Sequence, residues 1–223
     1  MSGLAPARGY ALWAPTYAAE TAVSALEASV VESFGVPLAG RRVLDVGCGI
    51  ARRLRPAREA GATVVAGVDL TPAMLARAHD EPLLAAADVR ALPVVDGAFD
   101  VVWCRLVLGH VSTLEAAYAE LARVCAPHAH VVVTDFHPAA AAAGHRRTFR
   151  DAQGVLHELE HHAHPQQAHR AAAERAGFAL RDCRDAVVGE PVRGFYERAD
   201  RLDAYERQLG LPIVLAMLFV RHP

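Results

Sequence analysis

Short apolar segments alternate with helical segments along most of this chain, and this alternation constrains the fold more than any other feature. The apolar segments lie at residues 42–46, 63–69, 83–88, 99–104 and 130–136. Each run is unbroken, as expected for a strand that helices cover on both faces. Strands that alternate with helices pair in parallel through right-handed crossovers. The sequence therefore predicts an α/β fold with a doubly wound sheet.

Helical patterns connect these strands and continue after them. An amphipathic helix is predicted over residues 16–34, and a second helix over residues 72–79, with Thr71 as its cap. Further helices are expected at residues 113–124, 166–176 and 195–209, and further strands at residues 178–188 and 213–220.

Two segments outside this alternation are expected to cover the sheet edge. Residues 155–162 alternate between two faces in a polar, His-rich stretch, which predicts an extra strand or hairpin. We expect one domain over residues 1–223, with a helical lid at residues 1–35 and a His-rich substrate lid at residues 139–165, inserted after the fifth strand.

Composition narrows the functional classes. The 223 residues are 53% hydrophobic, which argues against disorder, and the net charge of −2 argues against a nucleic-acid binder. The start lacks the pattern of a signal peptide, and the most apolar segment, residues 213–220, is far shorter than the roughly 20 residues of a membrane span. Four scattered cysteines without a CxxC pair indicate reduced thiols. We expect a cytoplasmic monomer or homodimer without a nucleic-acid or membrane partner.

The segment VLDVGCGIA, residues 43–51, predicts a binding site. Asp45 closes the first strand, at the sheet edge where open α/β sheets bind their ligands. Gly47 and Gly49 permit a tight turn and a close approach of the backbone to a ligand, and Cys48 is small enough for the same turn. The next helix begins near Arg52 and points its N-terminal amides at the same place. This pattern is typical of a nucleotide-type pocket.

Further acids indicate which nucleotide. Dinucleotide sites favour GxGxxG, whose third glycine is absent here. Asp69 closes the second strand 20 residues after Gly49, where a carboxylate can accept both hydroxyls of a ribose. Asp88 closes the third strand, where an acid can accept from the amine of adenine.

Four segments together carry a family resemblance: VLDVGCGIA, VVAGVDLTPAML, AADVRALPVVDGAFDVVWC and LVLGHVSTLEAAYAELARV. The chain resembles class I S-adenosylmethionine-dependent methyltransferases over residues 41–135. The resemblance implies a Rossmann-like, seven-stranded mixed sheet whose last strand is antiparallel. It implies S-adenosylmethionine as cofactor and S-adenosylhomocysteine as product.

The resemblance also assigns roles to individual positions. Asp45, Gly47 and Gly49 match positions at the methionine end of the cofactor, and Asp69 matches the ribose-binding position. Leu70 would pack on adenine, Asp88 and the Val89 amide would bind its edge, and Cys104 and Arg105 would lie beside the sulfonium. One departure is Ala51, where the family commonly has a further glycine.

A weakly nucleophilic acceptor also requires a base. His110 follows the fourth strand and is the first choice, because histidine titrates near neutrality. The other candidates are His137 after the fifth strand, His161 and His157 on the expected hairpin, Tyr17 with Tyr10 and Trp13 in an aromatic lid, and Arg147 and Arg150 as assisting cations. For each, a packing or surface role is the alternative.

The His-rich stretch also raises the question of zinc. No cysteine accompanies His157, His161, His162, His164 and His169, and their spacing matches no closed ligand set. We expect no metal site.

These observations favour a methyltransferase acting on a small acceptor at C, N or O. The aromatic N-terminus and the His-rich lid favour an aromatic or heteroaromatic natural product. The chain is also similar in layout to enzymes that methylate the indole ring, which use a Tyr-His-Arg type of deprotonation. Two alternatives remain open: a nicotinamide-dependent oxidoreductase and a non-catalytic cofactor-binding scaffold protein.

Overall fold

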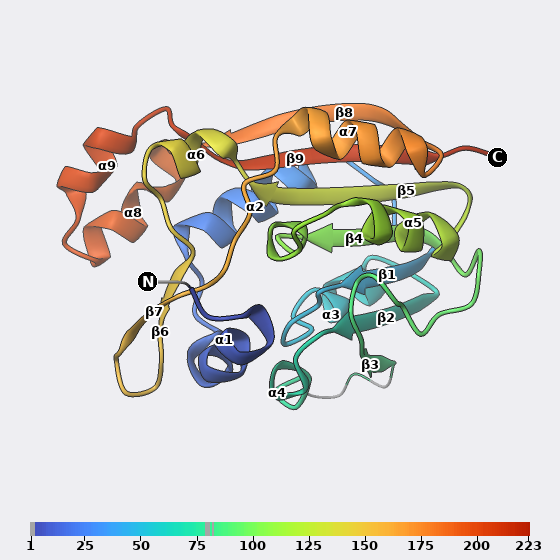
Figure 1. Ribbon diagram of the computed structural model, residues 1–223, viewed down its shortest axis with the longest axis horizontal. Coiled ribbons are helices and arrows are strands. Elements are labelled where there is room, and N and C mark those ends of the chain that lie inside the picture. Colours follow the sequence, from blue (N-terminus) through green and yellow to red (C-terminus); the bar gives the residue numbers. More distant parts are fainter. Residues whose placement is uncertain (1–2, 79–80, 82) are drawn as a thin grey trace.

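A seven-stranded mixed sheet forms the centre of the computed structural model, which describes residues 3–78, 81 and 83–223 (Figure 1). The strand order is β3-β2-β1-β4-β5-β9-β8. Its strands are β1 (Arg42–Val46), β2 (Val64–Asp69), β3 (Leu84–Ala86), β4 (Phe99–Arg105), β5 (Cys125–Phe136), β8 (Phe178–Val187) and β9 (Pro212–Arg221).

The direction of the strands confirms the predicted Rossmann-like fold. β1 pairs in parallel with β2 and β4, whereas β9 runs antiparallel to both β5 and β8. The chain reverses its direction of winding between β3 and β4, so the carboxyl ends of β1 and β4 lie side by side at the switch point where such sheets bind ligands.

Helices cover both faces of the sheet, because successive strand residues point to opposite sides. Leu44 on β1 packs in a cluster with α5 (Glu115–Val124) and α7 (Gln166–Arg175), whereas its neighbour Val43 packs in a cluster with α3 (Leu54–Glu59). The helix α2 (Ala22–Glu32) lies on the α3 side through Val31. Figure 1 shows α5 and α7 in front of the sheet and α2 and α3 behind it.

Three helices differ from their predicted bounds. The expected helix 16–34 begins only at Ala22, because Thr21 and Ser24 form a capping box. The expected helix 195–209 is two helices, α8 (Glu190–Arg198) and α9 (Leu202–Gln208), separated by a turn in which Asp200 has a φ of 53°. The expected helix 72–79 is the short α4 (Pro72–Leu75), and the side chain of Thr71 makes no capping bond; residue 79 lies outside the described residues.

The two lid segments contact each other at the open edge of the sheet. The first contains α1 (Pro6–Trp13) and the 3-10 helix η1 (Ala14–Thr16), and the second contains α6 (Pro138–Ala142) and a hairpin of β6 (Thr148–Arg150) and β7 (Leu156–Glu158). Leu4 bridges to Leu159, and the Trp13 ring stacks on Phe149 with 4.9 Å between centroids. Figure 1 shows α1 beside the β6–β7 hairpin.

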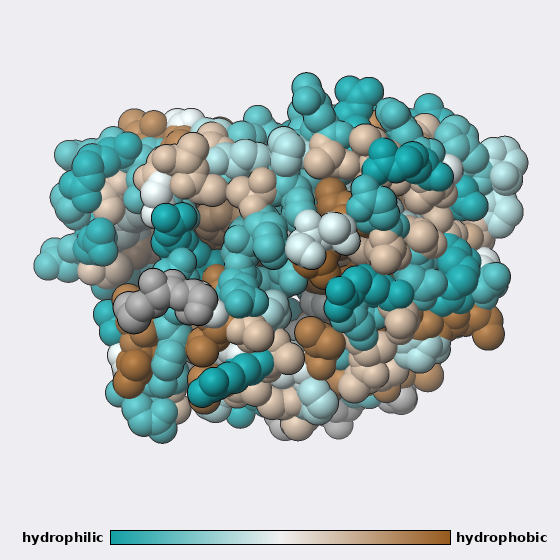
Figure 2. All heavy atoms as spheres, in the orientation of Figure 1, coloured by the Kyte–Doolittle hydropathy of each residue, from teal (hydrophilic) through white to brown (hydrophobic). Residues whose placement is uncertain are grey.

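The surface is mainly hydrophilic on the face shown in Figure 2, with hydrophobic residues in small groups. Among the described residues, no helix combines the length and the apolar character that crossing a membrane requires.

The β1 strand is a sensitive point for stability, because Leu44 is fully buried at the sheet centre. We expect Leu44→Ala to lower the free energy of unfolding by about 2–5 kcal/mol through the cavity that it leaves. Leu209→Ala is the control, since Leu209 is 60% exposed. Urea unfolding measures both, and equal losses in the two variants would contradict the described core.

Candidate functional site

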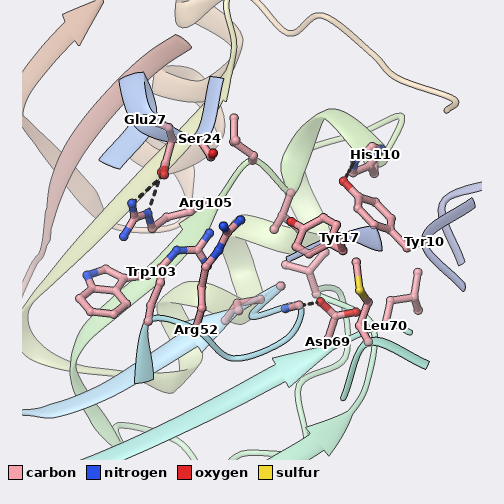
Figure 3. A pocket seen from close by; sticks show the side chains of 18 of the residues that line it. Tyr10, Tyr17, Ser24, Glu27, Arg52, Asp69, Leu70, Trp103, Arg105 and His110 are labelled. Atoms are coloured by element: carbon pink, nitrogen blue, oxygen red, sulfur yellow. Dashed lines mark hydrogen bonds and ion pairs between the residues drawn. The ribbon is translucent and has the colours of Figure 1, made fainter. Parts of the chain in front are cut away.

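A cavity of about 840 Å³ opens at the carboxyl ends of β1, β2 and β4. Its size falls within the range of about 300–1,000 Å³ that is usual for small-molecule sites. Figure 3 shows Asp69, Leu70 and Tyr17 on one side of this cavity, Tyr10 and His110 near its rim, and Glu27, Arg105 and Trp103 on the other side.

The turn after β1 forms part of the cavity wall and depends on its glycines. Gly47 has a φ of 73° and Gly49 a φ of 57°, in the left-handed region that glycine tolerates best. A Cβ on Gly47 would also collide with the side chain of Val107. Ala51, at the position where a further glycine is common, adopts a φ of 60° without being glycine. The sequence pattern therefore identified the turn, and the structure adds that Ala51 has a left-handed φ within it.

Asp69 connects this turn to the end of β2. Its Oδ2 accepts the N–H of Gly49 at 2.8 Å, and its Oδ1 accepts the N–H of Thr71 at 2.8 Å. Burial raises the pKa of Asp69, and these two N–H groups oppose that effect. The carboxylate is thus held rigidly at the cavity wall, with lone pairs left for a ligand.

The next positions along this wall are Leu70, Asp88 and Val89. Leu70 lines the cavity and is 44% exposed, which leaves an apolar surface for a flat ring. Asp88 and Val89 also line it, although β3 ends at Ala86, two residues before Asp88. The carboxylate of Asp88 accepts two bonds from the Arg90 guanidinium, at 2.6 and 2.9 Å, a partner that the sequence interpretation missed.

Three predicted residues do not reach the cavity. Asp45, Cys48 and Cys104 are almost completely buried and are absent from the lining. The Asp45 carboxylate is paired at 3.0 Å with Arg53, which does line the cavity. Asp45 therefore acts on the site through Arg53, because a carboxylate at the sheet centre requires a compensating cation.

A buried ion pair borders the other side of the cavity. Arg105 donates to both oxygens of Glu27, each at 2.6 Å, and Thr134 donates to Glu27 at 2.9 Å. Arg105 lines the cavity as predicted, but its guanidinium is occupied by Glu27. Sequence analysis missed Glu27, although an acid beside the apolar stripe of helix 22–32 was a usable signal.

The rim of the cavity contains a tyrosine, a histidine and an arginine in contact. The Tyr10 hydroxyl lies 2.9 Å from Nε2 of His110, and Nη2 of Arg147 donates to the same hydroxyl at 3.4 Å. All three residues line the cavity. They come from α1, from the 3-10 helix η2 (Leu108–His110) and from the loop before β6, so the two lids and the sheet edge meet here.

The hydrogen bonds define the tautomer of His110. Its Nδ1 lies 3.0 Å from the Glu160 carbonyl oxygen, which can only accept, so Nδ1 carries the proton. Nε2 is then an acceptor and receives the Tyr10 hydroxyl. Burial and the nearby Arg147 lower the pKa of His110 to about 4. Burial raises the pKa of Tyr10, so both groups are neutral at pH 7.

Tyr17 lines the cavity as expected but occupies a different place from Tyr10. Its ring lies over the turn, with Cε1 3.4 Å from where a Cβ on Gly49 would stand, and the Arg52 guanidinium lies 5.5 Å from the ring centroid. Tyr17 also contacts Trp13 edge to face at 5.0 Å. The tyrosine that contacts a rim histidine is therefore Tyr10.

The remaining base candidates lie outside the cavity. His137 caps α6 by accepting the Ala139 N–H at 3.0 Å, and its Nε2 lies 3.5 Å from Asp185. Arg150 is exposed and donates to the Gly154 carbonyl. His157 pairs with Asp151 at 2.7 Å. None of these three lines the cavity, because a helix cap, a hairpin turn and an ion pair with Asp151 hold them elsewhere.

His161 lies behind the rim and does not line the cavity. Its ring meets His110 edge to face at 5.5 Å, and its Nε2 lies 3.6 Å from Asp135. Among the described residues, no group of three or more His, Cys, Asp or Glu side chains has the geometry to hold a metal ion.

Comparison with known proteins shows which domain and which fold this chain resembles. Residues 44–133 match the family described as methyltransferase domain. An S-adenosylmethionine-dependent methyltransferase from Mesorhizobium loti superposes with a TM-score of 0.70 at 23% identity, over 90% of this chain and all of that one.

Two curated relatives are similar in sequence. A malonyl-[acyl-carrier protein] O-methyltransferase of Halorhodospira halophila is 38% identical over 44% of this chain and 36% of its own length. The 27-O-demethylrifamycin SV methyltransferase of Amycolatopsis mediterranei is 30% identical over 58% of this chain and 54% of its own length. The chain thus spans about a third to a half of these relatives.

The matched domain over residues 44–133 is a methyltransferase domain, and the fold is the one seen in solved S-adenosylmethionine-dependent methyltransferases. Solved structures with this fold hold S-adenosylmethionine or S-adenosylhomocysteine, and the matched methyltransferase domain favours that cofactor over a nicotinamide. The cavity residues fit it: Asp69 offers a carboxylate for ribose hydroxyls and Leu70 an apolar surface for adenine. Arg52 lines the cavity and has no carboxylate within ion-pair distance among the residues described, so it is available to the cofactor carboxylate.

Asp69 is the residue through which cofactor binding is best tested. We expect Asp69→Ala to weaken S-adenosylhomocysteine binding at least tenfold, because a hydrogen bond to a charged group contributes about 1.5–3 kcal/mol. Titration calorimetry measures the affinity, with Asp203→Ala as a control on the distant, exposed α9. Unchanged affinity in a folded Asp69→Ala protein would remove Asp69 from the site.

Proposed function

We propose that this chain transfers a methyl group from S-adenosylmethionine to C, N or O of a small aromatic or heteroaromatic natural product, with indole-type acceptors included. Tyr10, His110 and Arg147 together remove the proton of the acceptor. The observation that carries this proposal is the hydrogen bond from the Tyr10 hydroxyl to Nε2 of His110 at the cavity rim.

The chemistry divides between the cofactor and the side chains. When bound, S-adenosylmethionine supplies an electrophilic methyl group on a sulfonium. The protein holds donor and acceptor in line, which removes much of the entropic barrier. The Tyr10 oxygen receives the acceptor proton while its own proton moves to Nε2 of His110. Arg147 stabilises the negative charge that develops on Tyr10 during this exchange.

The walls of the rim support an aromatic acceptor. Tyr10 and Trp13 are stacked with 5.6 Å between centroids, and Tyr17 meets both rings edge to face. Flat acceptors can stack against such rings, and the gain beyond burial is about 0.5–1.5 kcal/mol for each aromatic pair. The relative named 27-O-demethylrifamycin SV methyltransferase supports a natural-product acceptor more generally.

A metabolite extract incubated with the protein and methyl-labelled S-adenosylmethionine identifies the acceptor by mass spectrometry. We expect a labelled aromatic product. With that acceptor, His110→Ala should lower turnover about 10²–10⁴-fold, the usual contribution of a positioned base. The affinity of His110→Ala for S-adenosylhomocysteine should stay near that of the wild type.

His137→Ala is the matched control, because His137 also follows a strand end but caps α6 outside the cavity. Its turnover should stay near that of the wild type. Near-full turnover of His110→Ala would show that methyl transfer proceeds without this base.

The pKa of His110 predicts an unusual pH profile. Only neutral His110 accepts the Tyr10 proton, so activity should fall as the pH decreases through about 4, well below the ordinary histidine value of 6.5. kcat/KM measured between pH 3.5 and 8 should stay flat from pH 8 to about pH 5, with circular dichroism to confirm folding. An acidic limb near pH 6.5 in a folded protein would contradict the lowered pKa of His110 beside Arg147.

A further inference from the structure

A buried carboxylate lies directly behind the rim histidine. Asp135, near the end of β5, is fully buried between two imidazoles. Its Oδ1 lies 3.6 Å from Nε2 of His161, and its Oδ2 lies 3.4 Å from Nε2 of His169. Burial opposes its ionisation, but the adjacent His161 and His169 imidazoles hold the pKa of Asp135 well below its usual range. The site described above makes no use of this carboxylate.

The His169 side of this cluster belongs to the core. His169 is fully buried, and its Nδ1 lies 3.1 Å from the hydroxyl of Tyr118 on α5. The His161 side points instead toward the rim. His161 retains 14% side-chain exposure and packs edge to face on both Phe136 and His110. Asp135 therefore links the packed core to one residue that contacts the rim.

Gly109 creates the space in which His161 reaches Asp135. A Cβ at this position would collide with the His161 ring and would stand 2.7 Å from Oδ1 of Asp135. The Gly109 carbonyl also accepts the N–H of His162 at 2.7 Å. The residue before His110 thus holds His162 through its carbonyl and leaves room for the His161 ring.

The residue before His161 sets the tautomer of His110. The Glu160 carbonyl accepts Nδ1–H of His110, while the Glu160 N–H donates to the Leu4 carbonyl at 2.9 Å. Glu160 lies in the lid, two residues after the end of β7. Its position over His110 depends on how firmly His161 and His162 are held.

We propose that Asp135 is a positioning residue for the rim base. By anchoring His161, Asp135 holds the Glu160 carbonyl on Nδ1–H of His110 and so keeps Nε2 unprotonated toward Tyr10. Asp135 has this effect on the His110 tautomer whether or not His110 is catalytic. Only its effect on methyl transfer rests on the proposed function.

The direct test is the nitrogen spectrum of the His110 imidazole in ¹⁵N-labelled protein saturated with S-adenosylhomocysteine. In the wild type, Nδ1 should carry the proton. In Asp135→Asn, which preserves the shape and an acceptor for the Phe136 N–H, we expect a mixture of the two tautomers. His161→Gln changes the contact between His161 and Asp135 from the partly exposed side and should give the same mixture of tautomers. It serves as the test if Asp135→Asn fails to fold.

Asp151→Asn is the matched control, because it breaks a second His–Asp pair in the same lid without touching His110. It should leave the His110 spectrum unchanged. A pure Nδ1–H tautomer in folded Asp135→Asn and His161→Gln proteins would overturn the proposal.

Kinetics with the identified acceptor separate this proposal from the proposed function. Asp135→Asn should lower kcat at least tenfold with little change in KM for S-adenosylmethionine, and should add no loss in a His110→Ala background. An equal loss in that background would overturn action through His110. If His110→Ala keeps full turnover while the tautomer still changes in Asp135→Asn, the catalytic proposal fails and the positioning of His110 stands.

Discussion

The Asp69 carboxylate, which accepts the N–H groups of Gly49 and Thr71, is the interaction on which the rest of the site depends. It joins the turn after β1 to the chain after β2, while the N–H groups of Gly47 and Cys48 both donate to the Val68 carbonyl. The protein's own hydrogen bonds therefore hold the turn in place, which is the condition for preorganised binding. Every cofactor-binding role assigned above starts from this fixed backbone.

The geometry of the rim also depends on contacts between the two lid segments, which are far apart in sequence but lie over the same edge of the sheet. Trp13 from the first lid stacks on Phe149 from the second, and the N–H of Leu4 donates to the Glu158 carbonyl at 2.7 Å. His110 lies between them, with Tyr10 from one lid on Nε2 and the Glu160 carbonyl of the other on Nδ1. Each imidazole nitrogen is thus held by a different lid, so His110 acquires its orientation only when both are in place.

The sequence predicted the parts of the molecule that local physics determines. The ends of the first two strands and the glycine turn followed from apolar runs and backbone freedom; in the structure β2 ends at Asp69 as predicted, and β1 ends at Val46, one residue after Asp45. Lid chemistry was harder to predict, because it depends on packing between distant segments. His137 and Arg150 had plausible positions in the chain, yet a helix cap and a hairpin turn occupy them.

The sequence also could not predict which tyrosine contacts His110. Tyr10 and Tyr17 lie in one aromatic segment, and no local pattern distinguishes them. The 3-10 helix η1 between α1 and α2 turns Tyr17 toward the glycine loop and leaves Tyr10 beside His110. Likewise, the break between α8 and α9 was not predicted, because the residue with the left-handed φ is Asp200 and not a glycine.

A crystal structure with S-adenosylhomocysteine tests the central claim most directly, namely that this cavity presents the methyl donor to the Tyr10–His110 pair. The account predicts ribose hydroxyls on Asp69, adenine against Leu70 and the sulfur facing the Tyr10 hydroxyl. A ligand whose sulfur faces away from Tyr10 and His110, or whose ribose does not contact Asp69, would contradict it.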